Sequence, residues 1–112
     1  MAEERILFVD DEQNVLDGIR RRLRKTFSVE TALGAVEGLQ AVNKRGPFAV
    51  VVADLRMPVM DGIKFLIRVK KRAPDTVRMI LTGNADLESA IKAVNEGHIF
   101  RFMTKPCSTE DL

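Results

Sequence analysis

The sequence predicts an α/β fold in which helices cover both faces of a doubly wound parallel sheet. Short apolar runs rich in β-branched residues alternate with stretches whose apolar residues recur at helical spacing. The run FAVVVA (48–53) is continuously apolar, as expected of a strand buried on both faces of a sheet. A strict alternation of strand and helix indicates parallel strands joined by right-handed helical crossovers.

Five short apolar segments are expected to form the strands: Ile6–Val9, Ser28–Thr31, Ala49–Ala53, Met79–Leu81 and Ile99–Met103. Four helices are expected between them, from apolar residues at helical spacing: Val15, Leu16, Ile19 and Leu23; Ala35, Leu39 and Val42; Phe65, Leu66 and Val69; Leu87, Ala90, Ile91 and Val94. Turn residues agree with these boundaries, because RGPF and APDT follow the second and third helices and Gly97 follows the fourth.

Composition limits the function classes. A chain of 112 residues, 46% apolar and 30% charged, is expected to form one globular domain. We expect it to be cytoplasmic, without membrane contact, because its start does not resemble a secretory leader and no apolar run approaches the ~18 residues of a membrane span. The lone Cys107 excludes an internal disulfide and a cysteine-based zinc site.

Two basic runs, RRRLRK (20–25) and RVKKR (68–72), are interpreted as solvated helix faces. No aromatic residues interleave with them for base stacking, so direct binding of nucleic acid is not expected. His98 is given no role, since the sequence offers it no partners for a metal site.

Polar residues follow four of the five predicted strands. Asp10 and Asp11 follow the first, Asp54 the third, Thr82 the fourth and Lys105 the fifth. The carboxyl ends of parallel strands meet at one sheet edge, so these side chains are expected to converge there. Neighbouring carboxylates oppose folding unless a cation compensates them, and oxygen ligands suit Mg²⁺. With a lysine and a hydroxyl to bind phosphoryl oxygens, the set indicates phosphoryl transfer to an aspartate.

Each residue taken alone has another interpretation. Asp10 and Asp11 are also typical cap residues for a helix starting near Gln13, and Asp54 is also a typical turn residue. Thr82 alone suits the start of a helix, and Lys105 alone is an ordinary solvated lysine. Only the joint placement at successive strand ends favours a site.

Four motifs carry a family resemblance: VDDE, ADLRMPVMDG, ILTGNAD and FRFMTKP occur in order and at matching spacing. Over nearly all its length the chain resembles a two-component response-regulator receiver domain. The resemblance implies a flavodoxin-like strand order of 2-1-3-4-5, with the fifth helix truncated. It also implies a signalling switch rather than a turnover enzyme, phosphorylated by a sensor histidine kinase or phosphotransfer protein.

The resemblance further implies site roles. Asp54 is the expected phosphoacceptor, and Mg²⁺ is expected on Asp11, Asp54 and the backbone carbonyl of Arg56, with Asp10 acting mainly through water. Backbone N–H groups of Arg56 and Gly83 are expected to complete the phosphoryl cradle.

Three further expectations follow from the same resemblance. Phe102 occupies the position of the family's switch aromatic, Asn84 flanks the phosphoryl site, and a cis bond is expected between Lys105 and Pro106. The segments around TGNADLESAIKAVNEG and FRFMTKPC resemble receivers attached to HD-type cyclic-di-nucleotide phosphodiesterase domains.

Two other functions compete with the switch: a magnesium-dependent phosphohydrolase with an aspartate nucleophile, and a docking module used without phosphorylation. The hydrolases have a second acid two residues after the nucleophile, where this chain has Arg56.

We also expect residues 1–112 to be the N-terminal part of a longer protein with a C-terminal output domain. Without a full fifth helix, the first and fifth strands and the stripe of Val15, Ile19 and Leu23 should be partly bare, with self-association as one way to cover them.

Overall fold

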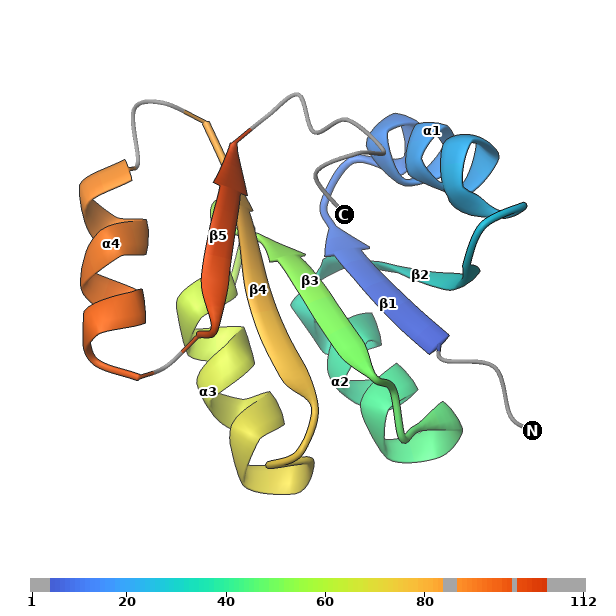
Figure 1. The fold of residues 1–112 in the computed structure, drawn as a ribbon. Helices are drawn as coiled ribbons and strands as arrows, with labels where there is room; N and C mark the ends of the chain where they lie inside the picture. Colours follow the sequence, from blue (N-terminus) through green and yellow to red (C-terminus); the bar gives the residue numbers. More distant parts are fainter. Residues whose placement is uncertain (1–4, 84–86, 98, 105–112) are drawn as a thin grey trace.

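Strands and helices alternate along the chain in the computed structural model, which describes residues 5–83, 87–97 and 99–104. The strands are β1 (Arg5–Asp10), β2 (Ser28–Leu33), β3 (Val50–Asp54), β4 (Val77–Thr82) and β5 (Arg101–Thr104). The helices are α1 (Gln13–Leu23), α2 (Gly34–Arg45), α3 (Gly62–Arg72) and α4 (Leu87–Asn95). All four strand pairs are parallel in the order β2-β1-β3-β4-β5 (Figure 1), which confirms the predicted fold and strand order. The expected start of a fifth helix lies outside the described residues.

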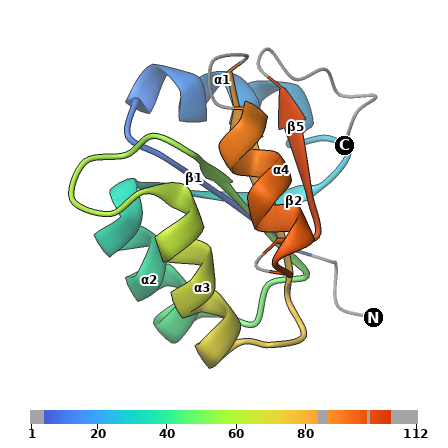
Figure 2. The same ribbon diagram turned by 90° about the vertical axis from the view of Figure 1, so that its left-hand side faces the viewer.

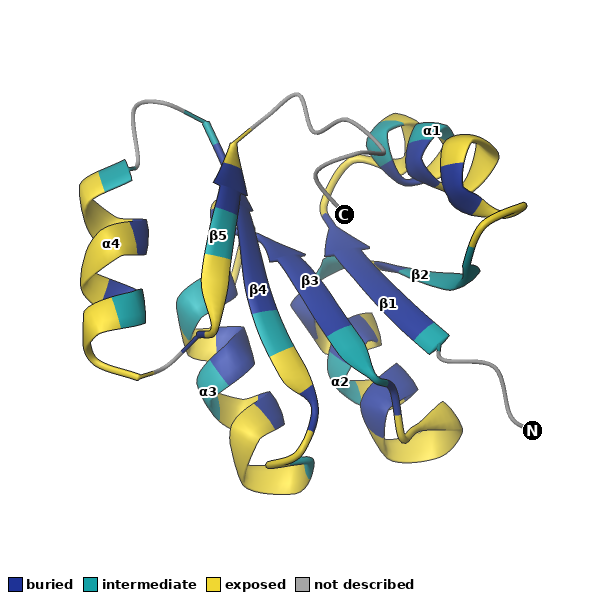
Figure 3. Ribbon diagram, viewed as in Figure 1, coloured by how far each residue is buried: buried dark blue, intermediate teal, exposed yellow. Residues whose placement is uncertain are grey.

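The strands divide their side chains between two apolar clusters, one on each face of the sheet. One cluster joins α2, α3 and α4 to alternate strand residues, namely Leu7, Val9, Val51, Ala53 and Ile80. The other joins α1 to the residues between them, namely Ile6, Phe8, Val52, Met79 and Leu81. Figure 2 shows α1 on the opposite side of the sheet from α2 and α3. The central strands are buried along most of their length (Figure 3), as the continuous run FAVVVA predicted.

Helix boundaries follow local chemistry. Helix α1 begins at Gln13, as expected. Helix α3 begins after Asp61, whose carboxylate accepts a hydrogen bond from the backbone N–H of Lys64 at 2.9 Å, an N-cap that satisfies one free N–H group. Gly97 follows α4 with φ at 77°, a left-handed angle that favours glycine, so its predicted place after that helix is confirmed.

The expectation of a partly bare face is wrong for most of the residues named. Ile19 and Leu23 are at most 5% exposed, Phe8 and Met103 on the strands are buried, and Val15 is half-buried, whereas Phe102 on β5 is half-buried and its neighbours Arg101 and Thr104 are exposed. Helix α1 packs its apolar stripe on β1 and β2, so Ile19, Leu23 and Phe8 cover one another.

None of the helices in the described ranges is long and apolar enough to cross a membrane.

Candidate functional site

Three neighbouring strands end in polar residues at the same edge of the sheet. Asp10 ends β1, Asp54 ends β3 and Thr82 ends β4. Their side chains belong to the few buried polar groups of the described chain, with exposures of 2%, 7% and 1%. Asp11 follows β1 directly and is exposed. The sequence predicted that five side chains converge at this edge; these four do, and the fifth, Lys105, lies outside the described residues.

The three carboxylates form a compact cluster. One oxygen each from Asp10, Asp11 and Asp54 lies within 4.8 Å of the others. In an octahedral Mg²⁺ site with ligands at 2.0–2.1 Å, neighbouring ligand oxygens are about 2.9 Å apart and opposite ones about 4.2 Å, so the three carboxylates are close enough to share one ion, directly or through water. The donor set also fits, because it consists of hard carboxylate oxygens, two of them held in place by burial. The cluster is thus chemically suited to a magnesium ion.

Asp10 does not cap the following helix. Its Oδ1 accepts a hydrogen bond from the backbone N–H of Glu12 at 3.0 Å, within the turn that leaves β1. The N-cap of α1 is Glu12, whose side chain makes no capping hydrogen bond in the described structure. The cap interpretation of Asp10 and Asp11 is therefore wrong, and both carboxylates stay with the cluster.

The loop after Asp54 is tied down at both ends by backbone hydrogen bonds. The N–H of Leu55 donates to the carbonyl of Leu81 on β4 at 3.2 Å, which extends the strand pairing one residue past Asp54. The N–H of Gly62, where α3 begins, donates back to the carbonyl of Leu55 at 2.8 Å. These bonds fix the segment that carries Arg56 beside the acidic cluster.

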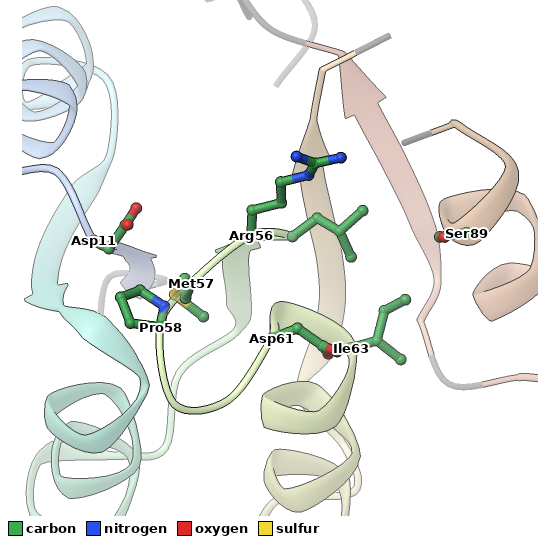
Figure 4. A pocket seen from close by; sticks show the side chains of 8 residues that line it. Asp11, Arg56, Met57, Pro58, Asp61, Ile63 and Ser89 are labelled. Atoms are coloured by element: carbon green, nitrogen blue, oxygen red, sulfur yellow. The ribbon is translucent and has the colours of Figure 1, made fainter. Parts of the chain in front are cut away.

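A pocket of about 460 Å³ opens beside the cluster. It is lined by Asp11, Leu55, Arg56, Met57, Pro58, Asp61, Ile63 and Ser89. Figure 4 shows the β3–α3 loop in the middle of this pocket, with Asp11 on one side and Ser89 of α4 on the other. Asp11 is the member of the acidic cluster that lines the pocket, which therefore adjoins the cluster on the side of Asp11 and Arg56.

The two residues predicted to act in the switch, Thr82 and Phe102, lie on the adjacent strands β4 and β5. The Thr82 hydroxyl donates to the carbonyl of Gly83 at 3.2 Å, and Thr82 ends a strand rather than starting a helix. Phe102 is half-buried on β5, in register with Ile80 on β4. Its ring packs against the apolar cluster that joins α2, α3 and α4 to the sheet. Asn84, His98, Lys105, Pro106 and Cys107 lie outside the described residues, as does the expected cis bond between Lys105 and Pro106.

Sequence reasoning missed two polar residues of the pocket, Asp61 and Ser89. The sequence did carry a signal for Asp61, because an aspartate before the glycine that starts a helix is a typical N-cap and so marks the start of α3. Ser89 offered none, since it reaches the site only through the packing of α4.

The model of the response regulator receiver domain family matches residues 6–112. The chain belongs to this family. It is 40% identical over 107 residues to the hydrogenase transcriptional regulatory protein HoxA of Cupriavidus necator, covering 96% of this chain and 22% of that protein. The chain therefore spans less than a quarter of that relative's length.

Two solved structures are also similar. One, described as adenylate cyclase from Rhodopirellula baltica, has a TM-score of 0.92 and 42% identity, covering 98% of this receiver and 82% of that chain. The other is the signal receiver domain of an HD domain-containing protein from Pseudomonas fluorescens, with a TM-score of 0.88, 31% identity, and coverage of 98% and 88%. Receiver domains of two-component systems are phosphorylation-dependent switches that use Mg²⁺ at an acidic pocket, and the three carboxylates form such a pocket here.

Proposed function

We propose that Asp54 of this receiver accepts a phosphoryl group from a phosphohistidine on a sensor kinase or phosphotransfer protein. The single observation that carries the proposal is the cluster of Asp10, Asp11 and Asp54 at the carboxyl edge of the sheet. Within it, Asp54 ends the central strand and stands between the acids after β1 and the Thr82 hydroxyl at the end of β4. It is therefore the acid that metal and hydroxyl flank on both sides.

In the transfer, a carboxylate oxygen of Asp54 attacks phosphorus while the P–N bond to the donor imidazole breaks. The bonding pair stays on the imidazole nitrogen, which takes up a proton, and an aspartyl phosphate remains. The hydroxyl of Thr82 turns from the Gly83 carbonyl to donate to a phosphoryl oxygen, and Lys105 neutralises another. Backbone N–H groups of Arg56 and Gly83 complete the cradle.

A magnesium ion fits this site on Asp11, Asp54 and the backbone carbonyl of Arg56, with Asp10 reaching it through water. When bound, it neutralises the charge that builds up on the phosphoryl oxygens during transfer. The protein's own contribution is to hold two of the carboxylates in buried, fixed positions before the donor arrives.

The conformational change then extends from Thr82 on β4 to Phe102 on β5. Movement of Thr82 toward the phosphoryl group vacates space beside β4, and the half-buried ring of Phe102 turns inward. Because phenylalanine has no hydroxyl, the gain comes from apolar burial alone. We propose that a C-terminal output domain or a partner protein reads this change, in the cytoplasm. The similar proteins carry different descriptions, a transcriptional regulator, an adenylate cyclase and an HD domain-containing protein, so they favour no single output.

Phosphoryl uptake with Mg²⁺ tests the proposal. Acetyl phosphate should label the wild-type protein once and leave Asp54→Asn unlabelled, while Asp75→Asn, an exposed loop acid before β4, should label normally. Equal labelling of Asp54→Asn would overturn the assignment. Repeated turnover of the donor without a stable label would favour the phosphohydrolase, and no uptake by the wild type would favour a docking module.

A further inference from the structure

The first residue of α3 lies directly against the backbone of Asp54. Gly62 begins the helix, and a Cβ built on it would overlap the carbonyl oxygen of Asp54 and stand 3.0 Å from its carbonyl carbon. Ordinary contacts of a Cβ are 3.4 Å or longer, so the backbone of one of the two residues would have to move. The glycine therefore permits an approach that no other residue allows.

The backbone angle φ of Gly62 does not require a glycine. Its φ lies outside the left-handed range, in which the structure places Gly34 and Gly97, so alanine could adopt the same conformation. The atoms nearest to a Cβ at Gly62 belong to the Asp54 carbonyl and, at 3.0 Å, to Cδ1 of Ile80. The side chain of Ile80 can rearrange, whereas the carbonyl of Asp54 is part of the strand.

We propose that Gly62 is a positioning residue for phosphorylation, which lets α3 seat against the Asp54 carbonyl and so holds the Asp54 carboxylate at its distance from Asp10 and Asp11. The inference rests on the proposed role of Asp54 as acceptor. It assigns Gly62 no contact with phosphoryl group or metal, and its effect passes through the backbone.

Two hydrogen bonds make the Asp54 backbone sensitive to this contact. The N–H of Leu55 is fixed to the Leu81 carbonyl on β4, so the peptide after Asp54 cannot simply slide away from the helix. The N–H of Gly62 donates to the carbonyl of the same Leu55, so a shift of the helix start also pulls on this peptide. An added Cβ would therefore displace either the peptide after Asp54 or the start of α3. Both displacements change the position of Asp54 relative to Asp10 and Asp11.

Gly38 on α2 is the matched control. A Cβ there would also stand too close, 2.8 Å from Cε1 of the Phe65 ring and 3.1 Å from Cγ1 of Val9. Both neighbours are side-chain atoms, so neither conflict is with the backbone of a strand end. Gly38→Ala thus introduces a comparable steric conflict into the same apolar cluster, but with side chains rather than with the Asp54 carbonyl.

The experiment compares Gly62→Ala with Gly38→Ala, both in a Gly18→Ala background. Gly18 is inside α1, where a Cβ would meet only a distant arginine side-chain atom at 4.0 Å, so alanine there adds stability. Two quantities are measured at a temperature where every variant is folded: the rate of labelling by acetyl phosphate at saturating Mg²⁺, and the Kd of Mg²⁺. The chain has no tryptophan, so Mg²⁺ binding is followed by NMR amide shifts.

We expect both variants to melt at a lower temperature than the parent, and Gly62→Ala alone to be labelled about 10- to 100-fold more slowly, as expected of a displacement near 1 Å. Its Mg²⁺ affinity should also fall, whereas Gly38→Ala keeps the parent's affinity and rate. Equal rates and affinities for the two variants would overturn the proposal, because a purely structural role moves only the melting temperature.

A third variant tests the proposal if Gly62→Ala does not fold. Adding Ile80→Val removes Cδ1 and relieves the side-chain contact, while the contact with the Asp54 carbonyl remains. Measured against Ile80→Val alone, this double variant should stay slow, and recovery of the rate would overturn the proposal. If the parent takes up no phosphoryl group at all, the proposed function fails instead, and the Mg²⁺ affinities still decide whether Gly62 positions Asp54.

Discussion

Asp10 and Asp54 end adjacent parallel strands, each one residue beyond the register pair Val9 and Ala53. Both carboxylates are almost fully buried. Burying like charges side by side opposes folding unless a cation offsets the repulsion. The sheet register thus creates a local repulsion that a bound metal ion would offset, and metal binding is then expected to stabilise this receiver.

The first prediction follows for Mg²⁺. At ten times its Kd, Mg²⁺ should raise the free energy of unfolding of the wild type by about 1.4 kcal/mol. Asp54→Asn should be more stable than the wild type without Mg²⁺, because one of the repelling charges is gone, and should gain little when Mg²⁺ is added. Urea unfolding with and without Mg²⁺ measures both effects, and Asp75→Asn should behave as the wild type. An equal response of Asp54→Asn to Mg²⁺ would place the ion elsewhere.

The second prediction concerns pH. Glu30 of β2 accepts hydrogen bonds from Nε of Arg5 at 2.9 Å and from Nε of Arg45 at 2.7 Å. Partial burial raises the pKa of Glu30, but the hydrogen bonds and positive charges of the two arginines outweigh it and hold the pKa below 4.5. A lowered pKa means that the ionised form stabilises the fold at pH values above 4.5. This contribution is lost as the pH falls through the pKa of the folded state.

Glu30→Gln should therefore lower the free energy of unfolding at pH 7 by about 0.2–1 kcal/mol, the range measured for ion pairs that are partly open to solvent. The difference from the wild type should shrink as the pH falls below 4.5, when the native carboxylate is protonated as well. Chemical unfolding across this range tests the sign. A difference that stays constant with pH would mean that the charge on Glu30 contributes nothing.

The sequence predicted the centre of the sheet better than its edges. Strand β3 is buried on both faces, so its apolar run alone indicated it. Edge strand β2 extends to Leu33, two residues beyond the prediction, because Leu33 pairs with Asp10 on β1. At the other edge Ile99 precedes β5, which begins at Arg101, opposite Met79. Pairing partners set these ends, and no local pattern in the sequence shows them.

The same distinction applies to the site. The meeting of Asp10, Asp11 and Asp54 could be predicted, because parallel strands bring their carboxyl ends together whatever the details of packing. The close approach of Gly62 to Asp54 could not, since it depends on how α3 returns to the sheet.

The third prediction concerns the loop between β3 and α3. Val59 has φ at 73° and is 95% exposed, at the centre of a tight turn in which the N–H of Met60 donates to the carbonyl of Pro58 at 2.7 Å. A β-branched residue in this region is strained by about 1–2 kcal/mol. Val59→Gly should therefore raise the melting temperature, although glycine adds freedom to the unfolded chain.

Val36 is the matched control, because it is also an exposed valine but lies within α2. Val36→Gly should lower stability by roughly 0.5 kcal/mol through loss of helix propensity. Opposite signs for the same substitution would confirm the strain at Val59. A loss of stability at both positions would show that the backbone at Val59 is not strained.

The last prediction compares the two buried threonines that flank β4. Thr82 ends the strand at the acidic edge, and Thr76 precedes it at the other edge, where its hydroxyl donates to the carbonyl of Phe48 at 2.8 Å. Replacement of either by valine, which has nearly the same shape, removes one hydrogen bond and should cost about 1 kcal/mol of stability. Only Thr82→Val should also be phosphorylated more slowly, by about a hundredfold, because it alone removes a donor to the phosphoryl group. The NMR shifts around Phe102 on phosphorylation should be lost with Thr82→Val and kept with Thr76→Val, and equal rates and shifts in the two variants would remove Thr82 from the site.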